Sequence, residues 1–249
     1  MGQNYLIMTK ITQAFIFSAG RGERMKPITD TIPKPLVKIK GKAIIDYTIE
    51  KLDQISSIKK IIINGFYLAD EIEDHIKKLR NPKIIFSREK EKVETGGGLV
   101  FASDKIDLHK PLLTINGDVL WEDEGISNDI ELLSKNFNGC DCDILLGLKK
   151  THDYIGYDGN ANGGGDFEMV GDALYRFPDE AMSYAYVGLQ IINPKILEKA
   201  PDKCFSMSYF YKSAVAENGL VHRIKGVELK GKYFHIGNVA AIKNTEDRL

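Results

Sequence analysis

The chain has 249 residues, of which 43% are hydrophobic and 28% are charged, and its formal net charge is −1. This length is sufficient for one large domain or two small ones with a sizeable core. A charge balance this even gives little support to a nucleic-acid-binding surface, and no apolar run approaches the ~18 residues of a transmembrane helix. We therefore expect a globular protein without nucleic-acid or membrane partners, present as a monomer or a small homo-oligomer.

Three cysteines, Cys140, Cys142 and Cys204, are too few and odd in number for a disulfide framework, which favours a reducing compartment. No second Cys or His pair with zinc-finger spacing accompanies Cys140 and Cys142, so ordinary thiols are expected there. Residues 1–10 lack the basic start and the long apolar centre of a signal peptide. The expected location is the cytoplasm.

The first half of the chain alternates short apolar runs with amphipathic segments. Apolar runs predict buried strands at residues 14–17, 60–64, 84–86 and 112–116. Helical spacing of apolar residues predicts helices over 45–55 and 68–79, and a Gly-rich turn at 94–98 opens a further helix that reaches residue 102. The lysines of residues 38–42 predict a solvated turn. Strands that alternate with helices predict a mostly parallel sheet covered on both faces.

The pattern changes after about residue 143. A strand is expected at 144–148, and the Gly-, Asn- and Asp-rich residues 157–165 predict a mobile loop or a wide turn. Residues 169–170, 174–177 and 184–192 predict antiparallel strands, followed by a helix over 209–217 and two final short strands. No linker composition separates the halves. The expected fold is therefore one α/β domain over residues 1–249: a three-layer, Rossmann-like, mixed but mostly parallel sheet with an antiparallel extension.

A Gly-rich segment follows the first predicted strand and is the strongest functional signal. Its glycines, Gly20 and Gly22, allow the backbone to approach a polyphosphate closely, so that consecutive N–H groups can point at its oxygens. Arg24, Lys26 and Lys34 add positive charge within the same loop, although Lys26 alone could be a surface charge. A strand, a Gly-rich turn and basic residues together predict a nucleoside triphosphate site.

Asn116, Gly117 and Asp118 end the fourth predicted strand. Ligands of open parallel sheets bind beyond the carboxyl ends of the strands, so Asp118 can lie near the phosphates. A carboxylate there suits Mg²⁺, which commonly bridges a carboxylate and phosphate. The alternative is that Asp118 caps a helix or stabilises a turn. The Gly-rich turn at 94–98 could likewise bring a base or ribose close to the backbone, or be a plain loop.

Several of these segments together resemble the signature of sugar-1-phosphate nucleotidylyltransferases, namely residues 17–36, 94–98 and 116–118. Residues 63–68, 72–75 and 165–167 are most similar to those members that uridylylate N-acetylmuramate 1-phosphate in peptidoglycan recycling. Mannose-1-phosphate guanylyltransferases are close relatives. The resemblance extends from about residue 14 to residue 249 and is firmest before Trp121.

The resemblance implies that a sugar 1-phosphate attacks the α-phosphorus of an NTP in line and releases pyrophosphate. It implies a nucleotide-binding half at 14–120 and a sugar-phosphate-binding half at 143–249. It assigns nucleotide contacts to Ala19, Gly20, Gly22, Thr95, Gly96 and Gly97. Arg24 would bind the leaving pyrophosphate, Lys34 would neutralise the α-phosphate, and Asp118 would hold Mg²⁺. Asp166 and Gly188 would lie near the sugar.

One position departs from the resemblance. Relatives end with an aromatic-x-Asp-Val-Gly-Thr motif whose aspartate is a second metal ligand, and here His235 stands in its place. A neutral imidazole can bind a transition metal but is a poor ligand for Mg²⁺. Three interpretations are open: a metal such as Mn²⁺, a single-carboxylate Mg²⁺ site completed by water and phosphate, or lost catalysis.

The preferred hypothesis is an enzyme that joins N-acetylmuramate 1-phosphate to UTP. The alternatives are a guanylyltransferase for mannose or heptose 1-phosphate and a cytidylyltransferase for phosphocholine. A hypothesis of another class is an inactive regulatory subunit that binds a nucleotide sugar, which His235 favours. A dinucleotide-binding dehydrogenase is disfavoured, since Arg24, Pro27 and Pro33 stand where its fingerprint needs a third glycine opening a helix.

Overall fold

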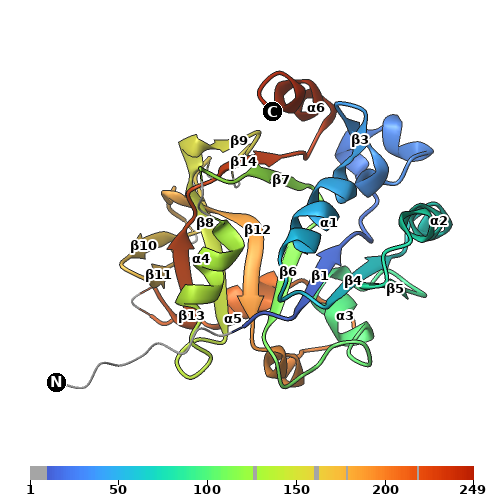
Figure 1. Ribbon diagram of the computed structural model, residues 1–249. Coiled ribbons are helices and arrows are strands. Elements are labelled where there is room, and N and C mark those ends of the chain that lie inside the picture. The colour runs from blue at the N-terminus through green and yellow to red at the C-terminus, as the bar shows by residue number, and fades with distance from the viewer. Residues whose placement is uncertain (1–9, 126–127, 160–162, 178, 218) are drawn as a thin grey trace.

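The computed structural model describes residues 10–125, 128–159, 163–177, 179–217 and 219–249 (Figure 1). Residues 1–9, for which the absence of a signal peptide was predicted, lie outside the described part. Residues 160–162 of the predicted loop at 157–165 lie outside it as well. Among the described residues, none of the helices has the length and apolar character that crossing a membrane requires.

Strands from both halves of the chain form one nine-stranded sheet, in the order β10-β11-β13-β8-β12-β6-β1-β4-β5. The first half contributes four mutually parallel strands: β1 (Gln13–Phe17), β4 (Lys60–Gly65), β5 (Ile84–Arg88) and β6 (Leu112–Asn116). The second half contributes β8 (Ile144–Lys150), β10 (Glu168–Val170), β11 (Ala173–Tyr175), β12 (Tyr184–Ile192) and β13 (Leu220–Glu228). β12 runs antiparallel to both β6 and β8, which confirms the mixed sheet with an antiparallel extension.

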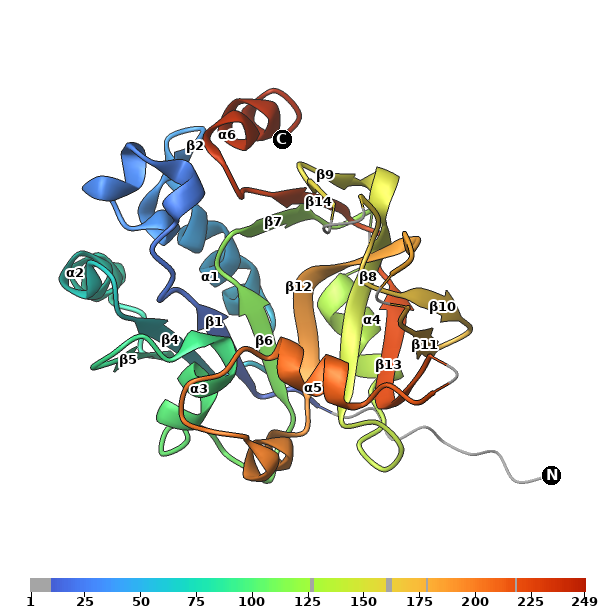
Figure 2. The same ribbon diagram turned by 180° about the vertical axis from the view of Figure 1, so that it is seen from behind.

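Helices cover both faces of this sheet because its strands are apolar on both sides. In β1, Ala14 and Ile16 face one hydrophobic cluster while Phe15 faces the other. The first cluster includes apolar residues of three helices: α1 (Ile44–Gln54), α2 (Ala69–Leu79) and α4 (Asp129–Asn136). The second includes residues of α3 (Glu94–Phe101) and α5 (Ser208–Ser213), together with the 3₁₀ segment η5 (Pro194–Lys199). Figure 1 shows α1 and α4 in front of the sheet, and Figure 2 shows α3 and α5 on its opposite face.

A smaller sheet stands beyond the carboxyl ends of the central strands and helps to enclose that edge (Figure 1). It consists of β7 (Val119–Glu122), β14 (Lys232–His235) and β9 (Tyr154–Ile155). The chain after β1 passes over the same edge through four short segments: η1 (Glu23–Met25), η2 (Ile28–Asp30), η3 (Lys34–Leu36) and the hairpin of β2 (Lys38–Ile39) with β3 (Lys42–Ala43). A further 3₁₀ segment, η4 (Thr151–Asp153), precedes β9.

Four local expectations need correction. The glycines at 96–98 lie inside α3 rather than in a turn before it, and residues 38–42 form a hairpin in which Ile39 is fully buried. The helix predicted over 209–217 ends at Ser213, because Val215 forms a β-bridge with Val221. The end of the chain forms β13 and β14 and then α6 (Val239–Glu246), a helix that the prediction lacked. Asn238 caps it by accepting a hydrogen bond from the Ala241 N–H at 2.9 Å.

Candidate active site

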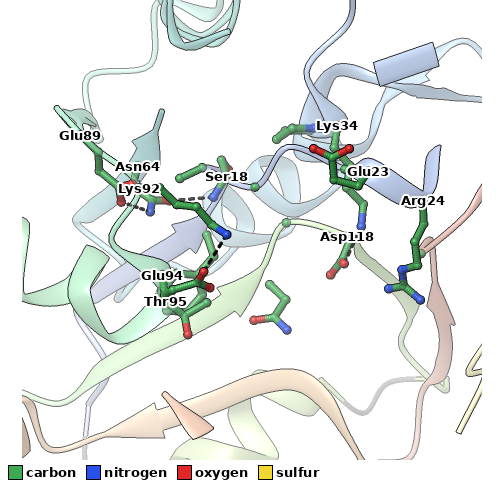
Figure 3. Close-up of a pocket in the computed structure, with 18 residues that line it drawn as sticks. Ser18, Glu23, Arg24, Lys34, Asn64, Glu89, Lys92, Glu94, Thr95 and Asp118 are labelled. Atoms are coloured by element: carbon green, nitrogen blue, oxygen red, sulfur yellow. Dashed lines mark hydrogen bonds and ion pairs between the residues drawn. The ribbon is translucent and has the colours of Figure 1, made fainter. Parts of the chain in front are cut away.

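A cavity of about 370 Å³ opens at the carboxyl ends of β1 and β6, beneath the Gly-rich loop (Figure 3). The predicted site residues that line it are Ala19, Gly20, Gly22, Arg24, Lys34, Thr95 and Asp118. They come from the β1–η1 loop, η1, η3, the start of α3 and the β6–β7 turn. The tertiary fold thus brings together segments that are up to about a hundred residues apart in the sequence.

Lys34, Asp118 and His235 meet at one side of the cavity. Lys34 Nζ lies 2.7 Å from Asp118 Oδ2, and His235 Nε2 lies 3.6 Å from the same oxygen. Burial alone raises the pKa of Asp118, but the Lys34 ammonium and the His235 imidazole outweigh it and hold this pKa well below its usual range. Asp118 is therefore a carboxylate at neutral pH. His235 Nδ1 is buried without a hydrogen-bond partner among the described residues.

The Gly-rich loop holds its shape through local backbone geometry. Gly22 has φ +65°, and a Cβ there would lie 3.0 Å from Thr29 Cγ2 and 3.1 Å from Lys34 Cβ, so this position favours glycine. Pro33 precedes the 3₁₀ turn that begins at Lys34, and its fixed φ directs the chain into that turn. Arg24 is more than half exposed and lies 3.5 Å from the Asp158 carboxylate. Figure 3 shows Arg24 and Lys34 pointing toward the region of Asp118.

The opposite side of the cavity holds a buried polar chain that the sequence analysis did not assign. The Ser18 N–H donates to Asn64 Oδ1 at 2.7 Å, and Asn64 Nδ2 donates to Glu89 Oε1 at 2.6 Å (Figure 3). Both Asn64 and Glu89 are almost fully buried. Their position in the sequence could have identified them as site residues, since each stands at or just beyond the carboxyl end of a parallel strand, where ligands bind.

The stability of the fold should depend on the ionisation of Glu89. Burial raises its pKa above the ordinary 4.5, and the Asn64 hydrogen bond offsets this only in part. The folded state then binds more protons than the unfolded chain, so the free energy of unfolding falls as the pH rises from about 4.5 through the folded-state pKa. We expect Glu89→Gln, which keeps an acceptor for Asn64, to be more stable than the parent at about pH 7 and to lose that advantage near pH 4.

Urea unfolding at several pH values measures this difference. The exposed Glu91 of the same loop provides the control, because Glu91→Gln should leave the pH dependence as it is. A Glu89→Gln variant whose stability parallels the parent at every pH would contradict the prediction.

The glycines of α3 are explained by packing. A Cβ on Gly96 would lie 2.3 Å from the Phe205 ring, and a Cβ on Gly97 would lie 2.3 Å from the Lys203 carbonyl oxygen. The Gly97 N–H donates to the Phe205 carbonyl at 3.0 Å, which ties the helix to this segment. Neither Gly96 nor Gly97 lines the cavity, whereas Thr95 does, and its Oγ1 accepts a hydrogen bond from the Met207 N–H at 2.9 Å.

Replacing Gly97 with alanine should therefore destabilise the protein. Its new methyl group meets a backbone carbonyl that cannot rotate away, and overpacking of this kind costs about 1–3 kcal/mol. Chemical denaturation measures the loss. Gly139→Ala is the matched control, because its nearest neighbour would be an ordinary contact at 3.6 Å. Equal stability of the two variants would show that the 203–205 segment moves freely.

A second cavity of about 350 Å³ adjoins the first and shares Phe17, Thr95 and Asn116 with it. Asp166, predicted to lie near the sugar, lines this second cavity. Its Oδ2 accepts a hydrogen bond from the Tyr186 N–H at 3.0 Å, and burial raises its pKa. Gly188 lies in β12 beside Asn116, where an added Cβ would be 2.9 Å from Asn116 Cβ, and it does not line the cavity.

The donor set at Asp118 suits a metal ion that is shared with a substrate. Within the described ranges, no group of three or more His, Cys, Asp or Glu side chains is arranged to hold a metal ion. Mg²⁺, however, is usually bound through one or two protein carboxylates plus substrate phosphates. Asp118 provides one such carboxylate. The 3.6 Å between His235 Nε2 and Asp118 Oδ2 places the imidazole beside this carboxylate.

Comparison with known proteins decides the family. A model of the nucleotidyl transferase family matches residues 13–157, which contain the Gly-rich loop, Lys34 and Asp118. The chain belongs to the nucleotidyl transferase family. It is 32% identical to N-acetylmuramate alpha-1-phosphate uridylyltransferase of Caulobacter vibrioides over 95% of this chain and 96% of that protein. This nucleotidyl transferase is a sugar-1-phosphate nucleotidylyltransferase, as the resemblance implied.

Solved structures share the fold of this nucleotidyl transferase. The inositol-1-phosphate CTP transferase from T. maritima superimposes with a TM-score of 0.74 at 13% identity, over 96% of this chain and 97% of that chain. HddC from Yersinia pseudotuberculosis, complexed with GMP-PN, gives a TM-score of 0.72 at 23% identity, over 96% and 99% of the two chains. At these identities the likeness shows the nucleotide-diphospho-sugar transferase fold.

Proposed function

We propose that the enzyme transfers a uridylyl group from UTP to N-acetylmuramate 1-phosphate and releases pyrophosphate. The observation that carries this proposal is the 32% identity to an N-acetylmuramate alpha-1-phosphate uridylyltransferase, because it extends over 95% of the chain and so includes the second cavity as well as the first. A nucleotide in the first cavity and a sugar 1-phosphate in the second would lie side by side, because the two cavities join at the shared residues Phe17, Thr95 and Asn116.

The residues of the first cavity would act by holding and neutralising phosphate. The backbone N–H groups of Ala19, Gly20 and Gly22 would bind the triphosphate. Lys34 would offset the negative charge that builds on the α-phosphate. Arg24 would hold the departing pyrophosphate. Thr95 would lie beside the nucleoside, and Gly96 and Gly97 would contribute by keeping α3 close to the 203–205 segment. Asp166 would accept hydrogen bonds from sugar hydroxyls, with Gly188 shaping the passage beside Asn116.

We propose that Asp118, together with phosphate oxygens, holds Mg²⁺, and that His235 orients the Asp118 carboxylate. The ion would supply charge neutralisation and orientation for the phosphates. Lys34 Nζ contacts the same carboxylate at 2.7 Å, so the ammonium and the ion would share its negative charge.

Pyrophosphate release from the purified protein tests this function. We would combine UTP, GTP, CTP and ATP in turn with N-acetylmuramate, mannose and glucose 1-phosphates and with phosphocholine, using Mg²⁺ and Mn²⁺ separately. Release with UTP and N-acetylmuramate 1-phosphate above all other pairs is the expected result. A higher kcat/KM for another pair would replace the proposed substrates. If no pair released pyrophosphate, the result would favour the inactive regulatory subunit, the hypothesis that His235 supports.

A further inference from the structure

The second cavity contains two cations, Arg176 and Lys212, that the proposed chemistry does not use. Arg176 follows β11, and Lys212 lies in the last turn of α5, so the two come from different parts of the second half of the chain. Among the described residues, neither side chain has an ion-pair partner within 4.0 Å, whereas Arg223 and Lys225 of the same half do. A cavity that accepts a neutral sugar needs no such charges.

Arg176 is held in place. Its guanidinium carbon lies 5.6 Å from the centroid of the Phe167 ring, a cation–π geometry, and Phe167 is itself fully buried. The backbone N–H of Arg176 donates a hydrogen bond to the Gly219 carbonyl at 2.8 Å, which anchors the main chain at this position. A planar guanidinium held against a ring has lost part of its side-chain freedom before a ligand arrives, so its hydrogen bonds to a carboxylate cost less entropy.

These cations are not among the residues that the two cavities share. The phosphate of the sugar attacks the α-phosphorus, so it belongs at the junction of the two cavities, where Phe17, Thr95 and Asn116 are shared. Arg176 and Lys212 line the second cavity alone. The acidic residue of that lining is Asp166. Its carboxylate accepts the Tyr186 N–H, and the Arg176 charge opposes the rise that burial causes in its pKa. With two cations and one carboxylate, the lining of the second cavity carries a net positive charge.

We infer that Arg176, assisted by Lys212, is a specificity-determining residue that binds a carboxylate on the sugar and selects acidic over neutral sugar 1-phosphates. This inference rests on the proposed function, because N-acetylmuramate carries such a carboxylate and N-acetylglucosamine does not. Arg176 makes the stronger contact, since a guanidinium can bind a carboxylate through two parallel N–H donors. Lys212 is exposed, so solvent screens its contribution.

The test compares matched acidic and neutral substrates. We would measure kcat/KM by pyrophosphate release for N-acetylmuramate 1-phosphate against N-acetylglucosamine 1-phosphate, and for glucuronate 1-phosphate against glucose 1-phosphate. Arg176→Gln should lower the acidic-to-neutral ratio about 10- to 100-fold, the size of a lost charged hydrogen bond. Lys212→Gln should lower it about 2- to 5-fold. Lys243→Gln, at the corresponding last turn of α6, is the matched control and should leave the ratio as it is.

Two outcomes would overturn the inference: a ratio that stays at the parent value in Arg176→Gln, or an equal loss for acidic and neutral substrates, as expected if Arg176 held the phosphate or the fold. Thermal unfolding of each variant identifies a merely structural loss. If UTP supports no turnover, the proposed function fails. Isothermal titration calorimetry then decides the inference separately, by comparing the affinity of the parent protein for the acidic and the neutral sugar 1-phosphate of each matched pair. Equal affinity of the parent protein for acidic and neutral partners would then reject it.

Discussion

Replacing Lys34 with alanine is expected to lower kcat by about 10²- to 10³-fold, the typical effect of removing one preorganised donor at a developing charge. Lys34 is largely buried, its Nζ points into the cavity, and the η3 turn after Pro33 fixes its backbone. A side chain held in this way would lose little order when the reaction begins, so in the proposed mechanism its charge would act fully on the α-phosphate. Removing it also removes a cause of the low Asp118 pKa.

Single-turnover kinetics with the proposed substrates measure this effect. Lys38→Ala is the matched control, because Lys38 is an exposed lysine of the neighbouring strand β2 and should leave kcat within about twofold. Circular dichroism and urea unfolding should show that Lys34→Ala retains its fold. A folded Lys34→Ala enzyme with the parent kcat would remove the proposed mechanism.

Replacing Asp118 with asparagine is expected to lower kcat/KM by about 10³-fold and to weaken the dependence on Mg²⁺. The change keeps the size of the side chain and its place in the β6–β7 turn, where the Asp118 carbonyl accepts the Ile236 N–H at 2.8 Å. It removes the negative charge that would face the metal ion and the Lys34 ammonium. The loss should therefore be electrostatic rather than structural.

Rates at increasing Mg²⁺ concentration, together with Mg²⁺-dependent nucleotide binding, test this second prediction. Asp104→Asn, at a mostly exposed aspartate after α3, is the control. His235→Asp is a companion change that restores the second carboxylate: it should lower the Mg²⁺ concentration needed for half-maximal rate in a working enzyme. An Asp118→Asn variant with the parent Mg²⁺ dependence would show that the metal binds elsewhere.

Residues close together along the chain are the ones whose arrangement their local pattern predicts well. The β1 strand, the Gly-rich loop and the Lys34 turn are contiguous, and their spacing predicted that they form one site. In the structure they lie together as one wall of the cavity. The prediction was less successful with the glycines at 96–98. Their composition is typical of a loop, but they form a helix because Phe205 and Lys203, more than a hundred residues later, pack directly against them.

Local patterns also missed the residues that act through distant partners. Asn64 lies in β4 and Glu89 directly follows β5, and only the parallel pairing of β1, β4 and β5 joins them to Ser18 in one buried chain. Likewise, nothing near Arg176 in the sequence indicates a binding residue. Its proposed binding role rests on its contact with the Phe167 ring and on Lys212 of α5, which the fold brings to the same cavity.

For this protein the sequence by itself determined the α/β class, the family signature and the Gly-rich loop of the first cavity, because hydrophobic period and backbone restrictions act over a few residues. Only the tertiary structure decided that His235 lies beside Asp118 and which glycines pack against other segments rather than line the cavity. It also decided that Arg176 and Lys212 line the second cavity. These depend on the order and direction of nine strands whose long-range pairing no local pattern specifies.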